Sequence, residues 1–206
     1  MSEIASIAAA IFRRGAKSRR ILVAIAGPPA AGKSTVAEEI AALLPTGAAA
    51  VVPMDGFHYD DAVLAARGLR ARKGAPETFD FGGFEALLKR MRAAEPDIAY
   101  PLFDRSRELS RAGAAVLGET VRFVLVEGNY LLLNEPPWTR LAELFDLGIF
   151  IDVPRDQLER RLLQRWRDHG RSEEDGRAWV TSNDLPNVDR VLAARRQADI
   201  VLRQQA

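Results

Sequence analysis

A six-residue apolar run, ILVAIA at 21–26, passes directly into the segment GPPAAGKST at 27–35. The segment has the form G-x-x-x-x-G-K-[ST], in which flexible glycines let successive backbone N–H groups point at phosphate oxygens. A helix that begins at Lys33 would direct the positive end of its dipole to the same point. A chance match in a strand-to-helix turn is the alternative, but both flanking elements that the motif requires are present here. We therefore predict a strand, a phosphate-binding loop and a helix.

Short apolar runs recur along the chain and alternate with helical stretches. Several of the runs are apolar at odd and even positions alike, which is typical of strands in a sheet that is covered on both faces. We predict strands at 21–26, 49–52, 121–126, 147–153 and 199–202, and helices at 33–44, 83–94, 136–145, 154–168 and 186–197. This alternation predicts an α/β fold with a parallel sheet of about five strands and helices on both faces.

Two segments, 60–82 and 97–120, are rich in glycine, proline and charged residues, and we predict that they are loops. Loops of this length in an α/β domain usually carry function, so we expect a second substrate there. The chain, 1–206, has the length of one ordinary domain, and residues 1–20 would add an amphipathic N-terminal helix packed on it.

The composition indicates a packed globular protein. Hydrophobic residues make up 48% of the chain, and 29 basic against 28 acidic side chains leave a formal charge of +1. No global field then favours nucleic acid or an anionic membrane. The lack of cysteine excludes disulfides and thiolate zinc sites and favours a reducing, cytoplasmic location. No apolar run approaches the roughly 18 residues of a spanning helix, so no membrane insertion is expected. Nothing in the sequence indicates an oligomeric state.

The phosphate-binding loop predicts a nucleotide and a metal ion. Lys33 would reach the β- and γ-phosphates, and the Ser34 hydroxyl would coordinate Mg²⁺. The residues expected to contact the nucleotide are Gly27, Ala30, Ala31, Gly32, Lys33, Ser34 and Thr35. No N-K-x-D run that would select guanine occurs, so ATP and Mg²⁺ are the expected cofactors.

A second metal ligand is expected at the end of a neighbouring strand, where VRFVLVEGNY places Glu127 after a largely apolar run. The Gly-Asn-Tyr that follows would let the chain turn sharply into the crevice above the sheet. Glu127 is therefore the candidate metal ligand, and Asn129 and Tyr130 are candidate substrate contacts. The alternative for Glu127 is an ordinary surface carboxylate at a strand end.

The segment PMDGFHYDD at 53–61 would follow the second strand, at the sheet edge where the ligands of open α/β sheets lie. Phosphoryl transfer to a hydroxyl requires a carboxylate that orients the acceptor and accepts its proton, and Asp55 suits this task. His58 and Tyr59 could hydrogen-bond the hydroxyls of an acceptor. The alternatives are a plain Asp-Gly turn for Asp55 and an ordinary polar wall for His58 and Tyr59.

Several motifs together resemble one superfamily of small kinases. They are GPPAAGKST, MDGFHYDD, RKGAPETFDFGGF, PLFDRSRE, VEGNYLLL, RDQLERRLLQRW and NDLPNVDRVLAARRQADIVL, and the resemblance covers nearly the whole chain, from about residue 20 to residue 203. The set resembles the uridine kinase, phosphoribulokinase and pantothenate kinase superfamily of P-loop kinases. Within it, VPMDGFHYDDAVL and the short chain look most like bacterial fructokinase-like proteins named as fructose transport system kinases.

The resemblance implies a P-loop fold with a helical lid and gives roles to further residues. Asp55 would act as the base or orient the acceptor, and Glu127 would lie near the metal and the acceptor. Candidate acceptor contacts in RKGAPETFDF and PLFDRSRE are Arg72, Lys73, Glu77, Asp80, Asp104, Arg105 and Arg107. A solvated charged face is the alternative for these loop residues. Phe103 stands where uridine kinases carry a tyrosine, which weakens a nucleoside acceptor.

The helix RDQLERRLLQRW places Arg161 and Arg165 on one face, four residues apart. The resemblance makes this segment, 155–175, a lid whose arginines close over the triphosphate and neutralise charge that develops during transfer. The alternative is a solvated face of i,i+4 ion pairs. Asn183 and Asn187 would approach the adenine, unless SNDLPN is simply a helix start.

Together these features predict an ATP-dependent kinase that transfers the γ-phosphoryl group of Mg-ATP to a hydroxyl of a small polar metabolite. The resemblance points to a sugar such as fructose, and uridine, cytidine and pantothenate are the alternatives within the enzyme class. A non-catalytic ATP-binding regulatory module of a sugar transport system is a different alternative. The acid, the histidine and the basic loops gathered where an acceptor would lie favour the kinase.

Overall fold

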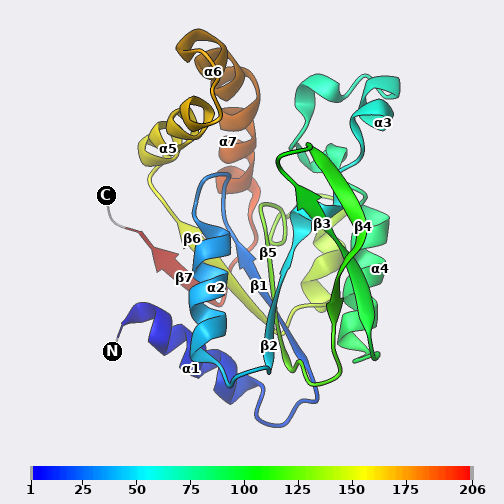
Figure 1. The fold of residues 1–206 in the computed structure, drawn as a ribbon. Coiled ribbons are helices and arrows are strands. Elements are labelled where there is room, and N and C mark those ends of the chain that lie inside the picture. The colour runs from blue at the N-terminus through cyan, green and yellow to red at the C-terminus, as the bar shows by residue number, and fades with distance from the viewer. Residues whose placement is uncertain (1, 205–206) are drawn as a thin grey trace.

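The computed structural model describes residues 2–204, which contain a five-stranded parallel sheet with helices on both faces (Figure 1). The strands of this sheet are β1 (Ile21–Ala26), β2 (Ala49–Pro53), β5 (Phe123–Gly128), β6 (Leu147–Asp152) and β7 (Ile200–Arg203). Their order is β2-β5-β1-β6-β7, and each neighbouring pair is parallel. The predicted α/β fold is therefore confirmed.

Helices and single helical turns connect these strands. The α-helices are α1 (Glu3–Arg14), α2 (Lys33–Leu43), α3 (Asp61–Ala66), α4 (Phe81–Arg92), α5 (Arg155–Asp168), α6 (Glu173–Trp179) and α7 (Leu185–Ala194). The 3-10 turns are η1 (Met54–Phe57), η2 (Arg70–Arg72), η3 (Pro76–Thr78) and η4 (Trp138–Glu143), and a π-helical turn, η5 (Val180–Asp184), joins α6 to α7. Among the described residues, no helix combines the length and the apolar character needed to cross a membrane.

The central strand β1 is buried on both faces. Leu22, Ala24 and Ala26 pack in one core with residues of α4 and η4, whereas the alternating residues Ile21 and Val23 pack in a second core with α1, α2 and α5. Because successive side chains of a strand point to opposite faces, a strand between two helical layers must be apolar at every position. This explains the unbroken run ILVAIA.

The largest departure from the sequence predictions is the segment 97–120, which we predicted to be a loop. It forms an antiparallel hairpin of β3 (Ile98–Asp104) and β4 (Leu109–Leu117). The hairpin escaped prediction because much of β4 is exposed and its one apolar run is the short AAVL at 114–117, and because Pro101 falls at a register shift between the two strands.

Two other segments also differ from prediction. Residues 60–82 contain α3, η2 and η3 instead of an irregular loop. Residues 136–145 contain the short 3-10 helix η4 in place of a longer α-helix. Pro137 stands at its N-cap, and neither Pro136 nor Pro137 has a backbone N–H to donate to a preceding helical turn.

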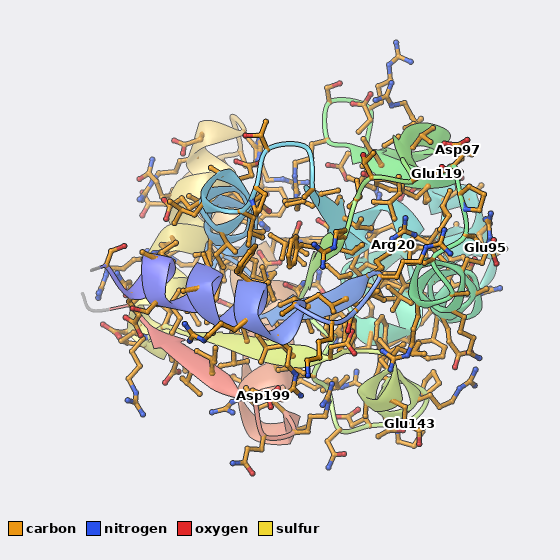
Figure 2. All side chains as sticks on the ribbon, turned by 90° about the horizontal axis from the view of Figure 1, so that it is seen from below. Arg20, Glu95, Asp97, Glu119, Glu143 and Asp199 are labelled. Atoms are coloured by element: carbon orange, nitrogen blue, oxygen red, sulfur yellow. The ribbon has the colours of Figure 1, made fainter. Side chains whose placement is uncertain are left out.

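At the amino end of the sheet, Arg20 forms a polar contact point between several segments. Its side chain donates hydrogen bonds to the carbonyl oxygens of Met91, Glu95, Gly118 and Val121 at 2.9–3.5 Å, and the residue is only 8% exposed. Figure 2, which views the molecule from below, shows Arg20 beside Glu95. One guanidinium thus joins α4, the end of the hairpin and the start of β5.

We expect Arg20→Leu to lower the free energy of unfolding by about 2–4 kcal/mol, because it leaves several partly buried carbonyl oxygens without a donor. Urea denaturation followed by circular dichroism would measure the change. Arg19→Leu is the matched control, since Arg19 is exposed, and it should shift stability by less than about 0.5 kcal/mol. Equal effects of the two substitutions would contradict the assigned role of Arg20.

Candidate functional site

A cleft of about 550 Å³ lies at the carboxyl ends of β1, β2 and β5. Segments that follow these strands form its floor, and the β3–β4 hairpin and the helices α5 to α7 contribute to its walls. The sequence candidates that line it are Ala30, Gly32, Lys33, Ser34, Thr35, Asp55, His58, Lys73, Arg105, Glu127, Asn129, Arg165 and Asn187. The fold therefore brings together residues that are widely separated in the sequence.

The glycine-rich loop at one end of the cleft has the backbone that its sequence predicts. Gly32 has φ 81°, in the left-handed region, and it is the N-cap of α2, which begins at Lys33. Gly27 packs closely, since a Cβ there would lie 3.1 Å from the carbonyl oxygen of Ile151. The Lys33 ammonium donates to the carbonyl oxygen of Pro28 at 3.0 Å. Burial lowers the pKa of Lys33, and the carboxylates of Glu127 and Asp55 oppose this shift.

Ser34 and Glu127 meet directly beside the loop. The Ser34 hydroxyl donates to Glu127 Oε1 at 3.1 Å, and Glu127 is 7% exposed. Burial raises the pKa of the Glu127 carboxyl, while the charge of Lys33 opposes the rise. A hydroxyl and a carboxylate are the oxygen ligands that Mg²⁺ prefers, and Mg²⁺ usually takes its other ligands from phosphates and water. The donor set therefore fits a magnesium ion.

Asp55 lies in η1, directly after β2, and faces the cleft from the side of the hairpin. Its Oδ2 accepts a hydrogen bond from Arg105 at 2.8 Å. The neighbouring Gly56 lies against the hairpin backbone, because a Cβ there would lie 2.3 Å from the carbonyl oxygen of Pro101. This close contact fixes the turn that carries Asp55 relative to the strand that ends just before Arg105.

His58 lies on the wall beside Asp55. Its ring centroid is 4.0 Å from that of Phe79 and 4.9 Å from that of Phe103. Its Nδ1 lies 2.8 Å from the carbonyl oxygen of Asp55. Burial lowers the pKa of His58, and the Asp55 carboxylate opposes the shift. Lys73, next to this wall, bonds Asp61 at 2.7 Å and Glu108 at 3.3 Å.

Several sequence candidates have their side chains committed elsewhere. Tyr59 does not line the cleft, and the guanidinium of Arg67 lies 4.2 Å from its ring centroid. Tyr130 is fully buried and donates to the carbonyl oxygen of Gly74. Asp104 accepts hydrogen bonds from Ser106 and from the backbone of Arg107, within the hairpin turn. Glu77 pairs with Arg190, and Asp80 caps α4 at Gly83.

Arg72 and the two asparagines join the acceptor loop to α7. Arg72 donates to Asn183 Oδ1 at 3.2 Å and to Asn187 Oδ1 at 3.4 Å. Asn183 donates in turn to the carbonyl oxygen of Lys73 at 2.8 Å. The side chains expected near the adenine therefore contact the segment that follows α3, although Asn187 also lines the cleft.

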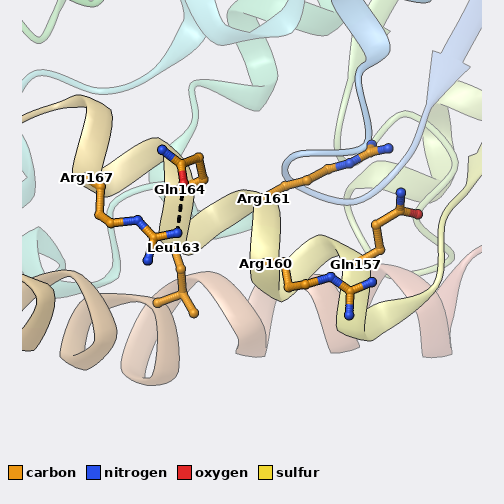
Figure 3. A pocket seen from close by; sticks show the side chains of 6 residues that line it. All are labelled: Gln157, Arg160, Arg161, Leu163, Gln164 and Arg167. Atoms are coloured by element: carbon orange, nitrogen blue, oxygen red, sulfur yellow. Dashed lines mark hydrogen bonds between the residues drawn. The ribbon is translucent and has the colours of Figure 1, made fainter. Parts of the chain in front are cut away.

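The two candidate lid arginines, Arg161 and Arg165, make different contacts. Figure 3 shows a pocket on α5 from which the Arg161 side chain reaches toward the glycine-rich loop, where it donates to the carbonyl oxygen of Ala30 at 3.3 Å and to Gln204 at 3.0 Å. Arg165 lines the cleft and lies 3.8 Å from Asp184. In the part of the chain that the structure describes, neither forms the i,i+4 ion pair of the alternative interpretation.

Sequence reasoning missed a group of aromatic and charged residues at the α5–α6 end of the cleft. Trp166 donates from Nε1 to Asp184 at 2.7 Å, and the Arg171 guanidinium lies 4.6 Å from the Trp166 ring centroid and 5.7 Å from that of Trp179. Burial raises the pKa of Asp184, and the bond from Trp166 opposes the rise. The available signal was that two of the three tryptophans flank the short segment around Arg171.

Comparison with known proteins shows to which family the chain belongs. A model of the Phosphoribulokinase / Uridine kinase family matches residues 22–204. The chain belongs to this family. Membership makes it a P-loop kinase, and it implies ATP as the phosphoryl donor.

Individual relatives agree with the family. The chain is 38% identical over 188 residues to the "Uncharacterized protein YggC" of Escherichia coli. The aligned region covers 89% of this chain and 78% of that protein. It is 30% identical over 197 residues to the "Putative uridine kinase C227.14" of Schizosaccharomyces pombe, covering 90% and 84%. A solved structure titled "putative fructose transport system kinase", from Silicibacter sp. TM1040, is 43% identical, with a TM-score of 0.93 and coverage of 98% and 99%.

Proposed function

We propose that this kinase transfers the γ-phosphoryl group of Mg-ATP to a hydroxyl of a small polar metabolite. The observation that carries the proposal is that the carboxylate of Asp55 lines the same cleft as Lys33, Ser34 and Glu127. A carboxylate opposite a triphosphate-binding loop suits an acceptor hydroxyl that must be oriented and deprotonated.

The proposed role of each residue follows from its position in the cleft. The backbone N–H groups of the glycine-rich loop and the Lys33 ammonium hold the β- and γ-phosphates. Ser34 and Glu127 hold the magnesium ion, which supplies charge neutralisation on the phosphate oxygens when it is bound. Oδ1 of Asp55, which accepts no hydrogen bond among residues 2–204, orients the acceptor hydroxyl and accepts its proton as the oxygen attacks, while Arg105 holds Oδ2.

The lid belongs to the same proposal. Arg165, on the cleft wall, would neutralise charge on the transferred group, and Arg161 would hold α5 against the glycine-rich loop through Ala30. We assign residues 155–175 to this lid and 1–206 to one domain. The shared core of α1, α2 and α5 supports the single domain.

For the acceptor, we propose a sugar such as fructose. The support is the 43% identity to the solved protein whose title names a fructose transport system, together with Phe103 where uridine kinases have tyrosine. Phe103 lines the cleft beside His58 and offers an apolar face but no hydroxyl. Such a face suits the C–H side of a sugar, whose hydroxyls then point to the polar wall.

A coupled assay of ADP release from Mg-ATP tests the proposal. The purified chain is given D-fructose, other hexoses and pentoses, uridine, cytidine and pantothenate in turn, and ATP binding is measured separately by calorimetry. We expect one class of acceptor to stimulate ADP release at least tenfold over the acceptor-free rate. ATP binding without stimulation by any acceptor would reject the kinase proposal in favour of a regulatory ATP-binding module.

A further inference from the structure

The carboxyl end of α5 holds the side chain of Trp166 in place. Gly170 has φ 75°, and its N–H donates to the carbonyl oxygen of Arg167 at 2.9 Å, while the N–H of Arg171 donates to that of Trp166 at 3.1 Å. This pair of hydrogen bonds is the Schellman motif, in which the residue after the glycine packs back on the helix. The Arg171 guanidinium accordingly lies 4.6 Å from the centroid of the Trp166 ring. The indole is therefore covered on one side and has little freedom to turn.

The carboxylate that faces this indole lies on an anchored turn. In η5 the N–H of Leu185 donates to the carbonyl oxygen of Val180, the backbone bond of a π-helical turn. Asn183 and Asp184, both buried, end this turn. Asn183 donates to the carbonyl oxygen of Lys73 at 2.8 Å. Single π-helical turns are rare and often lie at functional sites, so the position of Asp184 suggests a task.

Asp184 faces two consecutive residues of α5. Its Oδ2 accepts the indole hydrogen bond of Trp166 at 2.7 Å, and Nη2 of Arg165 lies 3.8 Å from the same oxygen. A distance of 3.8 Å is too long for a hydrogen bond, so the attraction between Arg165 and Asp184 is one of charge. Among residues 2–204, Asp184 is the one carboxylate within ion-pair distance of Arg165. The pairing thus draws the guanidinium to one place without using up its N–H donors.

Arg165 needs such a partner because it shares the cleft with another buried cation. Arg165 and Lys33 both line the cleft. Burial lowers the pKa of Lys33, and the positive charge of Arg165 adds to the shift, so the two cations face the same space. Repulsion between them favours turning the long arginine side chain outward to water. The carboxylate of Asp184 opposes that movement.

We propose that Asp184 is a positioning residue for Arg165, whose carboxylate, oriented by the indole of Trp166, holds the guanidinium on the cleft wall where it meets the transferred phosphoryl group. This inference rests on the proposed kinase function and adds to it a residue that acts through Arg165. A guanidinium has five N–H donors, so Arg165 can bond phosphate oxygens while it stays beside Asp184.

The first test is the kinetics of Asp184→Asn. The amide keeps the shape of the side chain and an oxygen for the indole of Trp166, but it loses the charge that holds Arg165. With the acceptor found in the assay, D-fructose first, we expect kcat to fall roughly 10- to 100-fold and the KM for the acceptor to stay unchanged. Asp189→Asn, an exposed site on the same helix α7, is the control and should keep kcat within about twofold. A kcat of Asp184→Asn within twofold of wild type would overturn the inference.

A double-mutant cycle tests whether Asp184 acts through Arg165. Arg165→Met removes the guanidinium and keeps much of the length of the side chain. In a chain that already carries Arg165→Met, Asp184→Asn should lower kcat by less than about a further twofold, since nothing is left to position. Losses that multiply in the double variant would show that Asp184 acts independently of Arg165, and would overturn the inference.

The indole of Trp166 reports on the fold of the same variant. The chain has three tryptophans, so ¹H–¹⁵N spectra of the full chain contain three indole N–H signals, and Trp166→Phe assigns one of them. In Asp184→Asn we expect the Trp166 indole proton to remain protected from exchange with water, because the amide oxygen still accepts it. Loss of this protection together with kcat would make Asp184 a purely structural residue and overturn the inference alone. A wild-type chain whose ADP release no acceptor stimulates would overturn the proposed function as well.

Discussion

Asp55→Asn is expected to lower kcat about 10²- to 10⁴-fold, the range for loss of a general base. An amide has nearly the shape of the carboxylate and can still accept a hydrogen bond from Arg105, but it cannot take the proton of the acceptor hydroxyl. Affinity for Mg-ATP should change little, because Lys33, Ser34 and Glu127 are untouched. Single-turnover kinetics together with calorimetric ATP binding would separate the two effects.

Asp189→Asn is the matched control for Asp55→Asn. Asp189 is exposed and pairs with Arg155 at the surface, outside the cleft. We expect it to keep kcat within about twofold of wild type, since a surface ion pair contributes little. Turnover retained in Asp55→Asn, or ATP binding lost in it, would remove Asp55 from the role of base.

Gly56→Ala is expected to destabilise the fold by about 3 kcal/mol or more. The added Cβ would lie 2.3 Å from the carbonyl oxygen of Pro101 and 2.7 Å from its carbonyl carbon, and a backbone cannot retreat as a flexible side chain can. Either the hairpin or η1 must move, and η1 carries Asp55. We therefore expect a lower urea midpoint and, in the fraction that folds, a lower kcat.

The control for this substitution is Gly118→Ala, at the end of the same hairpin. A Cβ there meets no atom within 4 Å, and Gly118 has no positive φ. Its effect on the free energy of unfolding should stay within about 0.5 kcal/mol. Comparable stability of the two variants would show that the hairpin does not press on η1 in solution.

The sequence predicted the sheet because its strands carry a strong local signal. Runs such as ILVAIA are apolar on both parities, and burial between two layers leaves no other choice of residue. The glycine-rich loop was equally predictable, since its spacing is dictated by backbone geometry at a helix start. Glu127 and Asp55 were located because Glu127 directly follows one predicted strand, 121–126, and Asp55 lies three residues beyond the end of another, 49–52.

The rest depended on contacts between distant segments. The hairpin has one largely exposed strand and a proline at its register shift, so the local sequence pattern did not predict it. Tyr59 and Tyr130 lie within the candidate motifs MDGFHYDD and VEGNYLLL, but Tyr59 contacts Arg67 and Tyr130 contacts Gly74 instead of facing the cleft. The association of Trp166 with Asp184 likewise arises only when α5 meets the π-helical turn η5.

The strand order has a consequence for biosynthesis. The strand β1 that leads into the glycine-rich loop pairs with β5 and β6, and Ile21 is aligned with Phe123, roughly a hundred residues later. At the usual rate of translation, about 5–20 s pass before the ribosome delivers the first partner of β1. During that interval ILVAIA, apolar on both faces, is a nascent segment open to holdase chaperones and to aggregation. The strand that leads into the glycine-rich loop is thus also the strand that stays unpaired longest in a newly made chain and is exposed longest to aggregation.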